Sequence, residues 1–153
     1  MGTTLVLIEN HGLPPSPAGL GQRANNRASQ NKKRSVLIVD DEPLIADTLA
    51  EILNDGRNFD AVAVYDGQSA LQQARSEAPD ILITDVVMPE MNGIEVAKAV
   101  RSLCPKTRVV LLSGQAQTRN LTEQAKHEGY SFELWAKPIH PDLLLQRLKE
   151  NRT

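Results

Sequence analysis

Short apolar runs alternate with segments of helical spacing from Ser35 to the end of the chain. The runs are apolar at nearly every position, which is typical of strands that are covered on both faces of a sheet. The segments between them place apolar residues three or four positions apart, as at Ile45, Leu49 and Ile52. The pattern predicts strands at residues 35–40, 60–65, 80–85, 107–113 and 131–137, and helices at residues 43–53, 67–78, 93–103, 117–129 and 141–151.

This alternation of strand and helix predicts an α/β domain. Turn-forming pairs such as Asp66-Gly67 and Asn92-Gly93 separate the elements. Because each strand is followed by a helix, the connections should be right-handed crossovers between parallel strands, with helices on both faces of the sheet. The total length of 153 residues suits one domain.

The first 34 residues have a different composition. Residues 10–34 are rich in Pro, Gly, Asn, Ser and basic residues, and too few are apolar to offset the entropy of the chain. We therefore interpret residues 1–34 as a flexible basic and polar arm that precedes the domain at residues 35–153. Residues 3–9 (TTLVLIE) leave a second interpretation open, which is an additional edge strand or a partner-binding segment.

Charge and cysteine content narrow the class of protein. Residues 1–34 carry five basic residues against Glu9, a net charge of +4, and the other 12 basic and 18 acidic residues give −6. An acidic domain argues against nucleic acid as its direct partner. No apolar run approaches the length of a membrane span, and a single cysteine, Cys104, favours a reducing compartment, so we expect a cytoplasmic protein.

The residues that close the predicted strands are polar. Asp40 and Asp41 close the first strand and Asp85 the third, while Ser113 closes the fourth and Lys137 the fifth. In an open parallel sheet the functional crevice lies beyond the carboxyl ends of the strands. We therefore expect these side chains to share one edge of the sheet.

Three aspartates at one edge repel one another, and a divalent cation removes that conflict. Carboxylate oxygens in small number favour Mg²⁺ or Mn²⁺ over Zn²⁺, and the histidines are too scattered for a zinc site. A lysine and a hydroxyl are what a phosphoryl group needs around it, and a carboxylate is an established nucleophile toward phosphorus. The set predicts transfer of a phosphoryl group to an aspartate.

Four motifs carry a family resemblance. The stretches VLIVDDEP, ILITDVVMPEMNGIE, VVLLSG and AKP, in that order, resemble the receiver domain of two-component response regulators, from about Ser35 to Arg152. The resemblance implies a flavodoxin-like fold with a five-stranded parallel sheet in the strand order 2-1-3-4-5. Because the last predicted helix reaches residue 151 of 153, we expect a single-domain response regulator.

The resemblance also implies a role for each site residue. Asp85 is the phosphoacceptor, Asp41 and the Val87 carbonyl join it as direct Mg²⁺ ligands, and Asp40 acts through water. Lys137 pairs with Asp85 and then with the phosphoryl oxygens, and the peptide bond between Lys137 and Pro138 is cis. The hydroxyl of Ser113 moves to the phosphoryl group.

The resemblance implies that this movement of Ser113 alters a partner-binding surface. The fourth helix, the fifth strand and the fifth helix form that surface. Within it we place Leu121, Leu134 and Trp135. Leu134 departs from the family pattern, which has Tyr or Phe there, and alternation along the strand puts Trp135 on the opposite side. The fourth helix, with Leu121 and Ala125 as its clear apolar anchors, should be among the least stably packed elements.

The turn at residues 88–93 ends at Gly93, a residue type that can take positive φ, and the turn can hold the Val87 carbonyl toward the metal. The phosphodonor is expected to be a sensor histidine kinase or a histidine phosphotransfer protein, and the output a protein partner. A homodimer stays open as an alternative, and no separate enzymatic turnover is expected.

Three other functions remain as alternatives. The first is a constitutive binding module on the same fold, which Leu134 favours. The second is an aspartate-nucleophile phosphatase, although Val87 stands where that family has its acid/base aspartate. The third is a flavin binder, although no Ser/Thr/Gly-rich phosphate loop follows the first strand.

Overall fold

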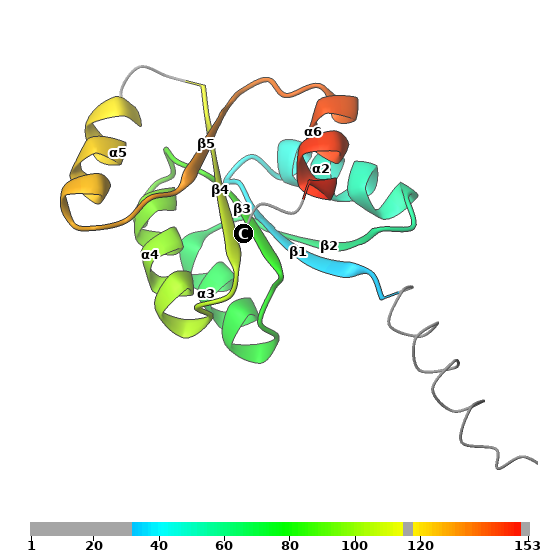
Figure 1. Ribbon diagram of the computed structural model, residues 1–153, viewed down its shortest axis with the longest axis horizontal. Coiled ribbons are helices and arrows are strands. Elements are labelled where there is room, and N and C mark those ends of the chain that lie inside the picture. Colours follow the sequence, from blue (N-terminus) through cyan, green and yellow to red (C-terminus); the bar gives the residue numbers. More distant parts are fainter. Residues whose placement is uncertain (1–31, 115–117, 151–153) are drawn as a thin grey trace, which may run out of the picture. The chain divides into compact units, whose positions relative to one another are not determined.

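The computed structural model describes residues 32–114 and 118–150. The predicted arm at residues 1–34 therefore lies almost wholly outside the described residues, and the alternative strand at residues 3–9 lies wholly outside them. Ten elements follow in strict alternation (Figure 1). They are β1 (Arg34–Val39), α2 (Pro43–Asp55), β2 (Phe59–Val64), α3 (Gly67–Ser76), β3 (Ile81–Asp85), α4 (Gly93–Leu103), β4 (Arg108–Ser113), α5 (Thr118–His127), β5 (Glu133–Ala136) and α6 (Pro141–Lys149).

The five strands form one parallel sheet in the order β2-β1-β3-β4-β5, which confirms the predicted flavodoxin-like fold. The central strand β3 pairs with β1 through Ile38 and Ile83 and with β4 through Ile83 and Val110. The predicted elements are all present, and their ends differ by one or two residues in most cases. The first strand, for example, begins at Arg34 rather than Ser35.

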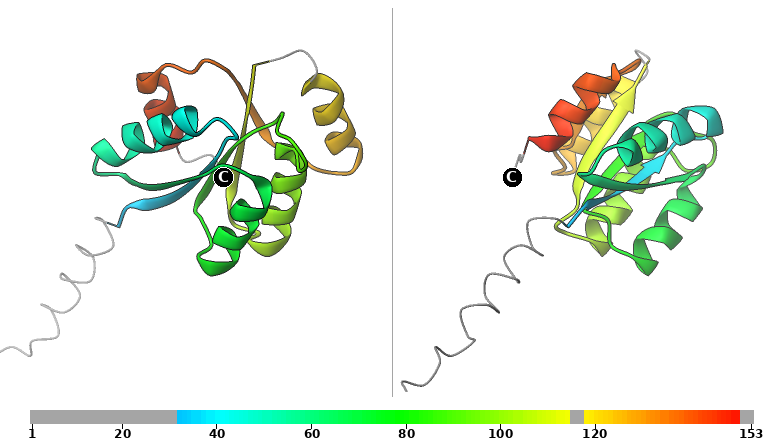
Figure 2. Two further views of the ribbon diagram at one scale, coloured as in Figure 1. Left: turned by 180° about the vertical axis from the view of Figure 1, so that it is seen from behind. Right: turned by 90° about the vertical axis from the view of Figure 1, so that its right-hand side faces the viewer.

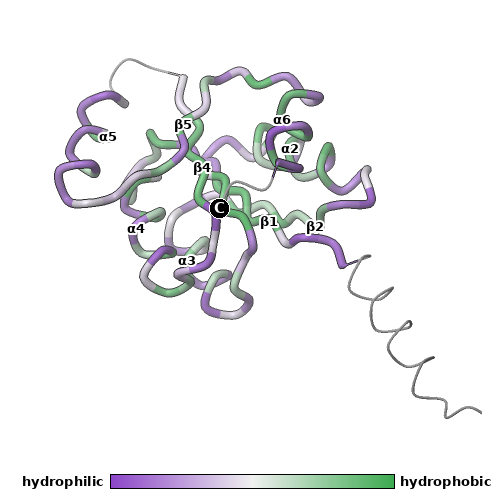
Figure 3. Tube along the Cα trace, viewed as in Figure 1, coloured by the Kyte–Doolittle hydropathy of each residue, from purple (hydrophilic) through white to green (hydrophobic). Residues whose placement is uncertain are grey.

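Successive side chains of each strand point to opposite faces of the sheet and pack into two separate cores. The strands are therefore apolar at nearly every position. Leu37 and Leu82 face the core that α3, α4 and α5 cover. Ile38 and Ile83 face the core under α2 and α6. Figure 2 shows helices on both sides of the sheet, and Figure 3 shows that its central strands are the most hydrophobic part of the trace.

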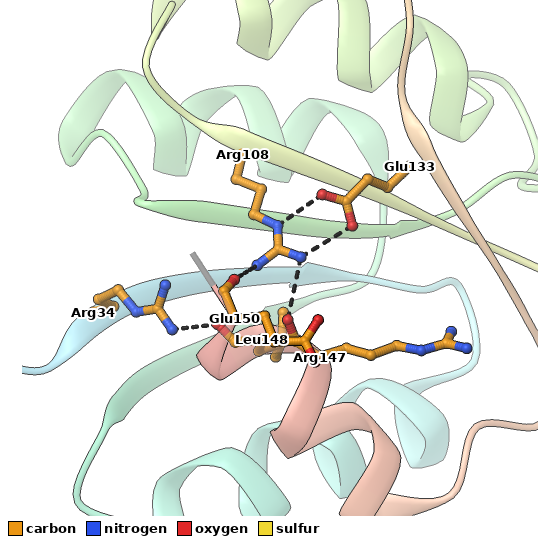
Figure 4. Close-up of polar contacts among 6 residues, drawn as sticks. All are labelled: Arg34, Arg108, Glu133, Arg147, Leu148 and Glu150. Atoms are coloured by element: carbon orange, nitrogen blue, oxygen red, sulfur yellow. Dashed lines mark hydrogen bonds and ion pairs between the residues drawn. The ribbon is translucent and has the colours of Figure 1, made fainter. Parts of the chain in front are cut away.

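The amino ends of β1 and β4 are tied to the end of α6 (Figure 4). Arg108 at the start of β4 donates two hydrogen bonds to the carboxylate of Glu133, at 2.9 and 3.0 Å. The same guanidinium donates to the carbonyls of Arg147 and Glu150, at 3.2 and 2.9 Å, and Arg34 donates to the carbonyl of Leu148. The bonds to Arg147 and Leu148 satisfy two of the last carbonyls of the helix, which have no partner within it, and the bond to Glu150 holds the residue that follows the helix.

Candidate functional site at the carboxyl edge of the sheet

The acidic residues meet where β1 and β3 end. One carboxylate oxygen from each of Asp40, Asp41 and Asp85 lies within 4.8 Å of the others. Asp40 follows β1 and is 1% exposed, Asp85 is the last residue of β3, and Asp41 is exposed to solvent. The structure thus brings together the three aspartates that the sequence singled out.

Asp40 is fixed on both of its oxygens. Its Oδ1 accepts a hydrogen bond from the backbone N–H of Glu42 at 3.0 Å, and its Oδ2 accepts one from Lys137 Nζ at 2.8 Å. A buried carboxylate is costly without such partners. Asp40 is therefore a rigid part of the site, and its pairing with Lys137 was not among the predicted contacts.

Lys137 bridges two of the aspartates. Its Nζ lies 2.8 Å from Asp40 and 3.3 Å from Oδ1 of Asp85, and its backbone N–H donates to the carbonyl of Ser113 at 2.8 Å. Burial alone lowers the pKa of the lysine, but the hydrogen bond to Asp40 and the charges of both carboxylates raise it above its ordinary value. Lys137 is thus a fixed positive charge beside Asp85. The peptide bond between Lys137 and Pro138 is cis, as the resemblance implied.

Asp85 is more easily protonated than an ordinary aspartate. Burial is the largest influence and raises its pKa, the charge of Lys137 opposes it, and the nearby Asp40 raises the pKa further. Its side chain is 14% exposed, so an incoming group can still reach it. A cation near the carboxylates would favour the ionised form, which is the nucleophilic one.

The donor set fits a small hard cation. Oxygens on opposite sides of a Mg²⁺ ion are about 4.2 Å apart, twice the usual Mg–O distance of about 2.1 Å. The spacing of the three carboxylates is close to that limit, and all of the donors are oxygen atoms, which Mg²⁺ and Mn²⁺ prefer. Asp41, which is exposed, would present a ligand from the solvent side.

The main chain after Asp85 is held tightly against α4. The backbone N–H of Gly93 donates to the carbonyl of Val86 at 2.9 Å, and a Cβ at position 93 would lie 1.8 Å from the carbonyl oxygen of Asp85. No L-side chain fits there. Gly93 does not use the positive φ that a glycine permits, and the positive φ in this turn belongs to Glu90, at 66°. The glycine is required by the close approach to Asp85 instead.

A capping box fixes the start of α4 next to this turn. The side chain of Asn92 accepts from the backbone N–H groups of Ile94 and Glu95, at 3.0 and 2.9 Å. The carboxylate of Glu95 accepts from the N–H of Asn92 in return, at 2.9 Å. Val87 precedes the turn and is 44% exposed, so the residue predicted to offer its carbonyl to the metal is accessible.

The other predicted residues lie on the opposite flank of the site. Ser113 ends β4, and its hydroxyl donates to the hydroxyl of Thr118 at the start of α5. Leu134 is 48% exposed, Trp135 is buried in the core below α6, and Leu121 packs against the other core as a partly buried residue. Sequence reasoning missed Thr118, and the available signal was a hydroxyl residue five positions after Ser113.

Comparisons with known proteins agree with this geometry. The model of the response regulator receiver domain matches residues 36–149. The chain is 29% identical over 117 residues to the DNA-binding response regulator MtrA of Mycolicibacterium smegmatis, covering 76% of this chain and 50% of the relative. It is 28% identical over 117 residues to the chemotaxis protein CheY of Thermotoga maritima, covering 76% of this chain and 96% of the relative.

Solved structures give the same result. The chemotaxis protein CheY4 of Vibrio cholerae superimposes with a TM-score of 0.68 at 31% identity, over 77% of this chain and 98% of the other. The chain thus spans half the length of MtrA but nearly all of the two chemotaxis proteins. Across the described ranges, the helices are too short or too polar to cross a bilayer.

Proposed function

The chain belongs to the response regulator receiver family of two-component systems, and from this premise we propose that Asp85 accepts a phosphoryl group from a phosphohistidine. The observation that carries the proposal is the convergence of Asp40, Asp41, Asp85 and Lys137 at one edge of the sheet. In the reaction, a carboxylate oxygen of Asp85 attacks phosphorus as the P–N bond breaks, and the bonding electrons leave with the imidazole, which takes up a proton.

Each neighbour of Asp85 would have a separate task. Lys137 would neutralise negative charge on Asp85 and then on the transferred oxygens, from the position it already holds at 3.3 Å. Mg²⁺ or Mn²⁺, when bound, would offset the remaining negative charge of the carboxylates and the phosphoryl group. Asp41, Asp85 and the Val87 carbonyl are the direct ligands in this proposal, and Asp40 acts through water. We propose no other substrate and no separate turnover.

The experiment is exposure of the protein to acetyl phosphate and Mg²⁺, followed by intact mass measurement. We expect the wild type to gain one phosphoryl group and Asp85→Asn to gain none. Asp66→Asn is the matched control, because Asp66 also follows a strand but only caps α3, where its side chain accepts from the N–H of Ser69. Equal labelling of wild type and Asp85→Asn would refute the proposal.

The output is proposed to be a protein partner on the surface formed by α5, β5 and α6. A cleft of about 440 Å³ lies between β5 and α6 of this surface, with Leu134, Trp135 and Leu143 as apolar lining and Arg147 at its side. Leu134 and Leu143 are 48% and 38% exposed, which supports a contact surface. The proposal also includes a cytoplasmic location and a partner other than nucleic acid. Its phosphodonor is a histidine kinase or a histidine phosphotransfer protein.

One observation favours a second function, a constitutive binding module. Leu134 occupies the position where the family usually carries an aromatic residue. The surface therefore lacks the ring whose rotamer would follow the movement of Ser113. If this alternative holds, a partner that is captured with the unphosphorylated protein will bind it with the same affinity after the protein has been phosphorylated. A change of affinity that Asp85→Asn abolishes would exclude it.

A further inference from the structure

The hydroxyl of Ser113 is engaged with α5 in this structure. Ser113 ends β4 and donates to the hydroxyl of Thr118, the first residue of α5. A serine hydroxyl carries a single hydrogen, so the same hydrogen cannot be donated to a second acceptor at the same time. The hydrogen bond that a phosphoryl group on Asp85 would require from Ser113 therefore competes with the one that it makes to Thr118.

Thr118 is placed so that the loss of this bond matters. It is 2% exposed, and it is one of the two buried residues of α5, with Ala125. A buried hydroxyl that loses its partner is penalised unless the surrounding structure rearranges or water enters. If Ser113 turns toward Asp85, the buried Thr118 hydroxyl must find a new partner, and movement of the first turn of α5 is the means to provide one.

The packing under α5 allows such movement. A cavity of about 90 Å³ lies between α5, β4 and β5, and it borders the helix from Thr122 onward, one turn after Thr118. The far end of the helix is better fixed, because the N–H of Tyr130 donates to the carbonyl of Ala125 and Gly129 takes a φ of 91° after the helix. Movement should therefore be concentrated at the start of α5, next to Thr118.

We propose that Thr118 is a positioning residue that holds the Ser113 hydroxyl toward α5 and thereby weakens binding of a phosphoryl group at Asp85. The proposal rests on the proposed function of Asp85 and adds a residue outside the acidic site. Release of the Ser113–Thr118 bond couples the state of Asp85 to the start of α5. The energetic link is one hydrogen bond between two neutral hydroxyls.

The test is the affinity for beryllium trifluoride in the presence of Mg²⁺, measured by titration calorimetry. This anion bonds to a carboxylate oxygen and presents fluorines where the phosphoryl oxygens would lie. Thr118→Val keeps the shape of the side chain and removes the hydroxyl, so it should bind the anion about two- to tenfold more tightly than wild type. Thr118→Ser retains the hydroxyl and should behave like wild type.

A double-mutant cycle separates this role from a general loosening of α5. Because Thr118 acts through Ser113, Thr118→Val should change the affinity only when Ser113 is present, and Ser113→Ala and the double variant should bind equally. An equal gain in both backgrounds, or no gain in the wild-type background, would overturn the proposal. If Thr118→Val does not fold, amide hydrogen exchange of wild type decides: exchange at residues 118–122 should rise when the anion binds, and unchanged exchange overturns it.

These outcomes are distinct from failure of the proposed function. If Asp85 is not a phosphoacceptor, wild type will gain no phosphate from acetyl phosphate and will not bind beryllium trifluoride. If only the role of Thr118 is wrong, wild type will bind the anion and Asp85→Asn will not. Thr118→Val will then bind it with the affinity of wild type.

Discussion

Helices α4 and α5 cover the same face of the sheet, and they meet it with different side chains. Five residues of α4 are buried (Gly93, Ile94, Val96, Ala97 and Val100), and a capping box closes its first turn. In α5 the buried residues are Thr118 and Ala125, and most of the helix is hydrophilic (Figure 3). The helix that touches the main chain of Asp85 is thus the firmly packed one, and the helix that touches Ser113 is the loosely packed one.

The difference suggests a division of labour within one fold. The proposed phosphoryl transfer needs its nucleophile and ligands held in position, and the contact between α4 and Asp85 would help to hold them. A switch needs an element whose alternative positions differ little in free energy, and few buried contacts produce that condition. The predictions below test the contrast, in order of decreasing effect.

The largest expected effect is the loss of a core contact of α4. Ile94 is 4% exposed, so Ile94→Ala should lower the free energy of unfolding by about 2–5 kcal/mol. The equivalent truncation in α5, Leu121→Ala, should cost about 1 kcal/mol because Leu121 is only partly buried. Urea denaturation of both variants measures the difference, and equal losses would contradict the contrast between the helices.

The next effect concerns the contact between Gly93 and Asp85. Gly93→Ala should lower the free energy of unfolding by about 1–3 kcal/mol, because the new Cβ displaces the Asp85 main chain, and it should slow labelling by acetyl phosphate. Gly56→Ala is the matched control. A Cβ there would meet only the Leu53 carbonyl oxygen at 3.8 Å, so stability and labelling should be kept. Normal labelling of Gly93→Ala would show that this contact does not position Asp85.

The contact between Gly93 and Asp85 illustrates the limit of what the sequence alone could predict. The strands, the helices and the meeting of Asp40, Asp85 and Lys137 followed from local periodicity and from the rule that parallel strands end at one edge. The close approach of Gly93 to Asp85 did not follow, because a turn sequence shows that glycine is permitted but not which main chain lies against it.

The Ser113–Thr118 bond was hidden for a similar reason. It joins residues on different elements, and apolar periodicity carries no information on where a hydroxyl points. The same limit applies to Lys137, for which the resemblance predicted Asp85 as the partner, whereas the structure places Asp40 closer, at 2.8 Å against 3.3 Å. The fold, the acidic site and the pairing of Lys137 with Asp85 were thus predictable from the sequence and the resemblance. The bonds from Lys137 to Asp40 and from Ser113 to Thr118 were not.

A smaller effect is expected at the cap of α4. Asn92→Ala removes an acceptor for two backbone N–H groups and should cost about 1 kcal/mol of unfolding free energy. Asn92→Asp keeps an acceptor at the same place and should retain most of the stability. Thermal unfolding of the three proteins measures the effect. If Asn92→Ala is as stable as wild type, the capping box does not explain the firmness of α4.

The smallest effect concerns the ion pair that joins the two helices. Lys98 of α4 donates to Glu128 just after α5, and this hydrogen bond is the main cause that lowers the pKa of Glu128 below its ordinary value of 4.5. A carboxylate with a lowered pKa in the folded state stabilises the protein above its unfolded pKa. That contribution is lost as the pH falls from about 4.5 through the lowered value.

Glu128→Gln should therefore shift the urea midpoint slightly downward at pH 7 and leave it unchanged at a pH below the lowered pKa, where wild type is protonated as well. Because the pair is exposed, added salt should shrink the difference at pH 7. A second readout is hydrogen exchange, which should rise in α5 and stay constant in α4, since the buried residues of α4 hold it without Lys98. If exchange rises equally in both helices, then α4 depends on the pair as much as α5 does, and the firmness of α4 does not come from its own core.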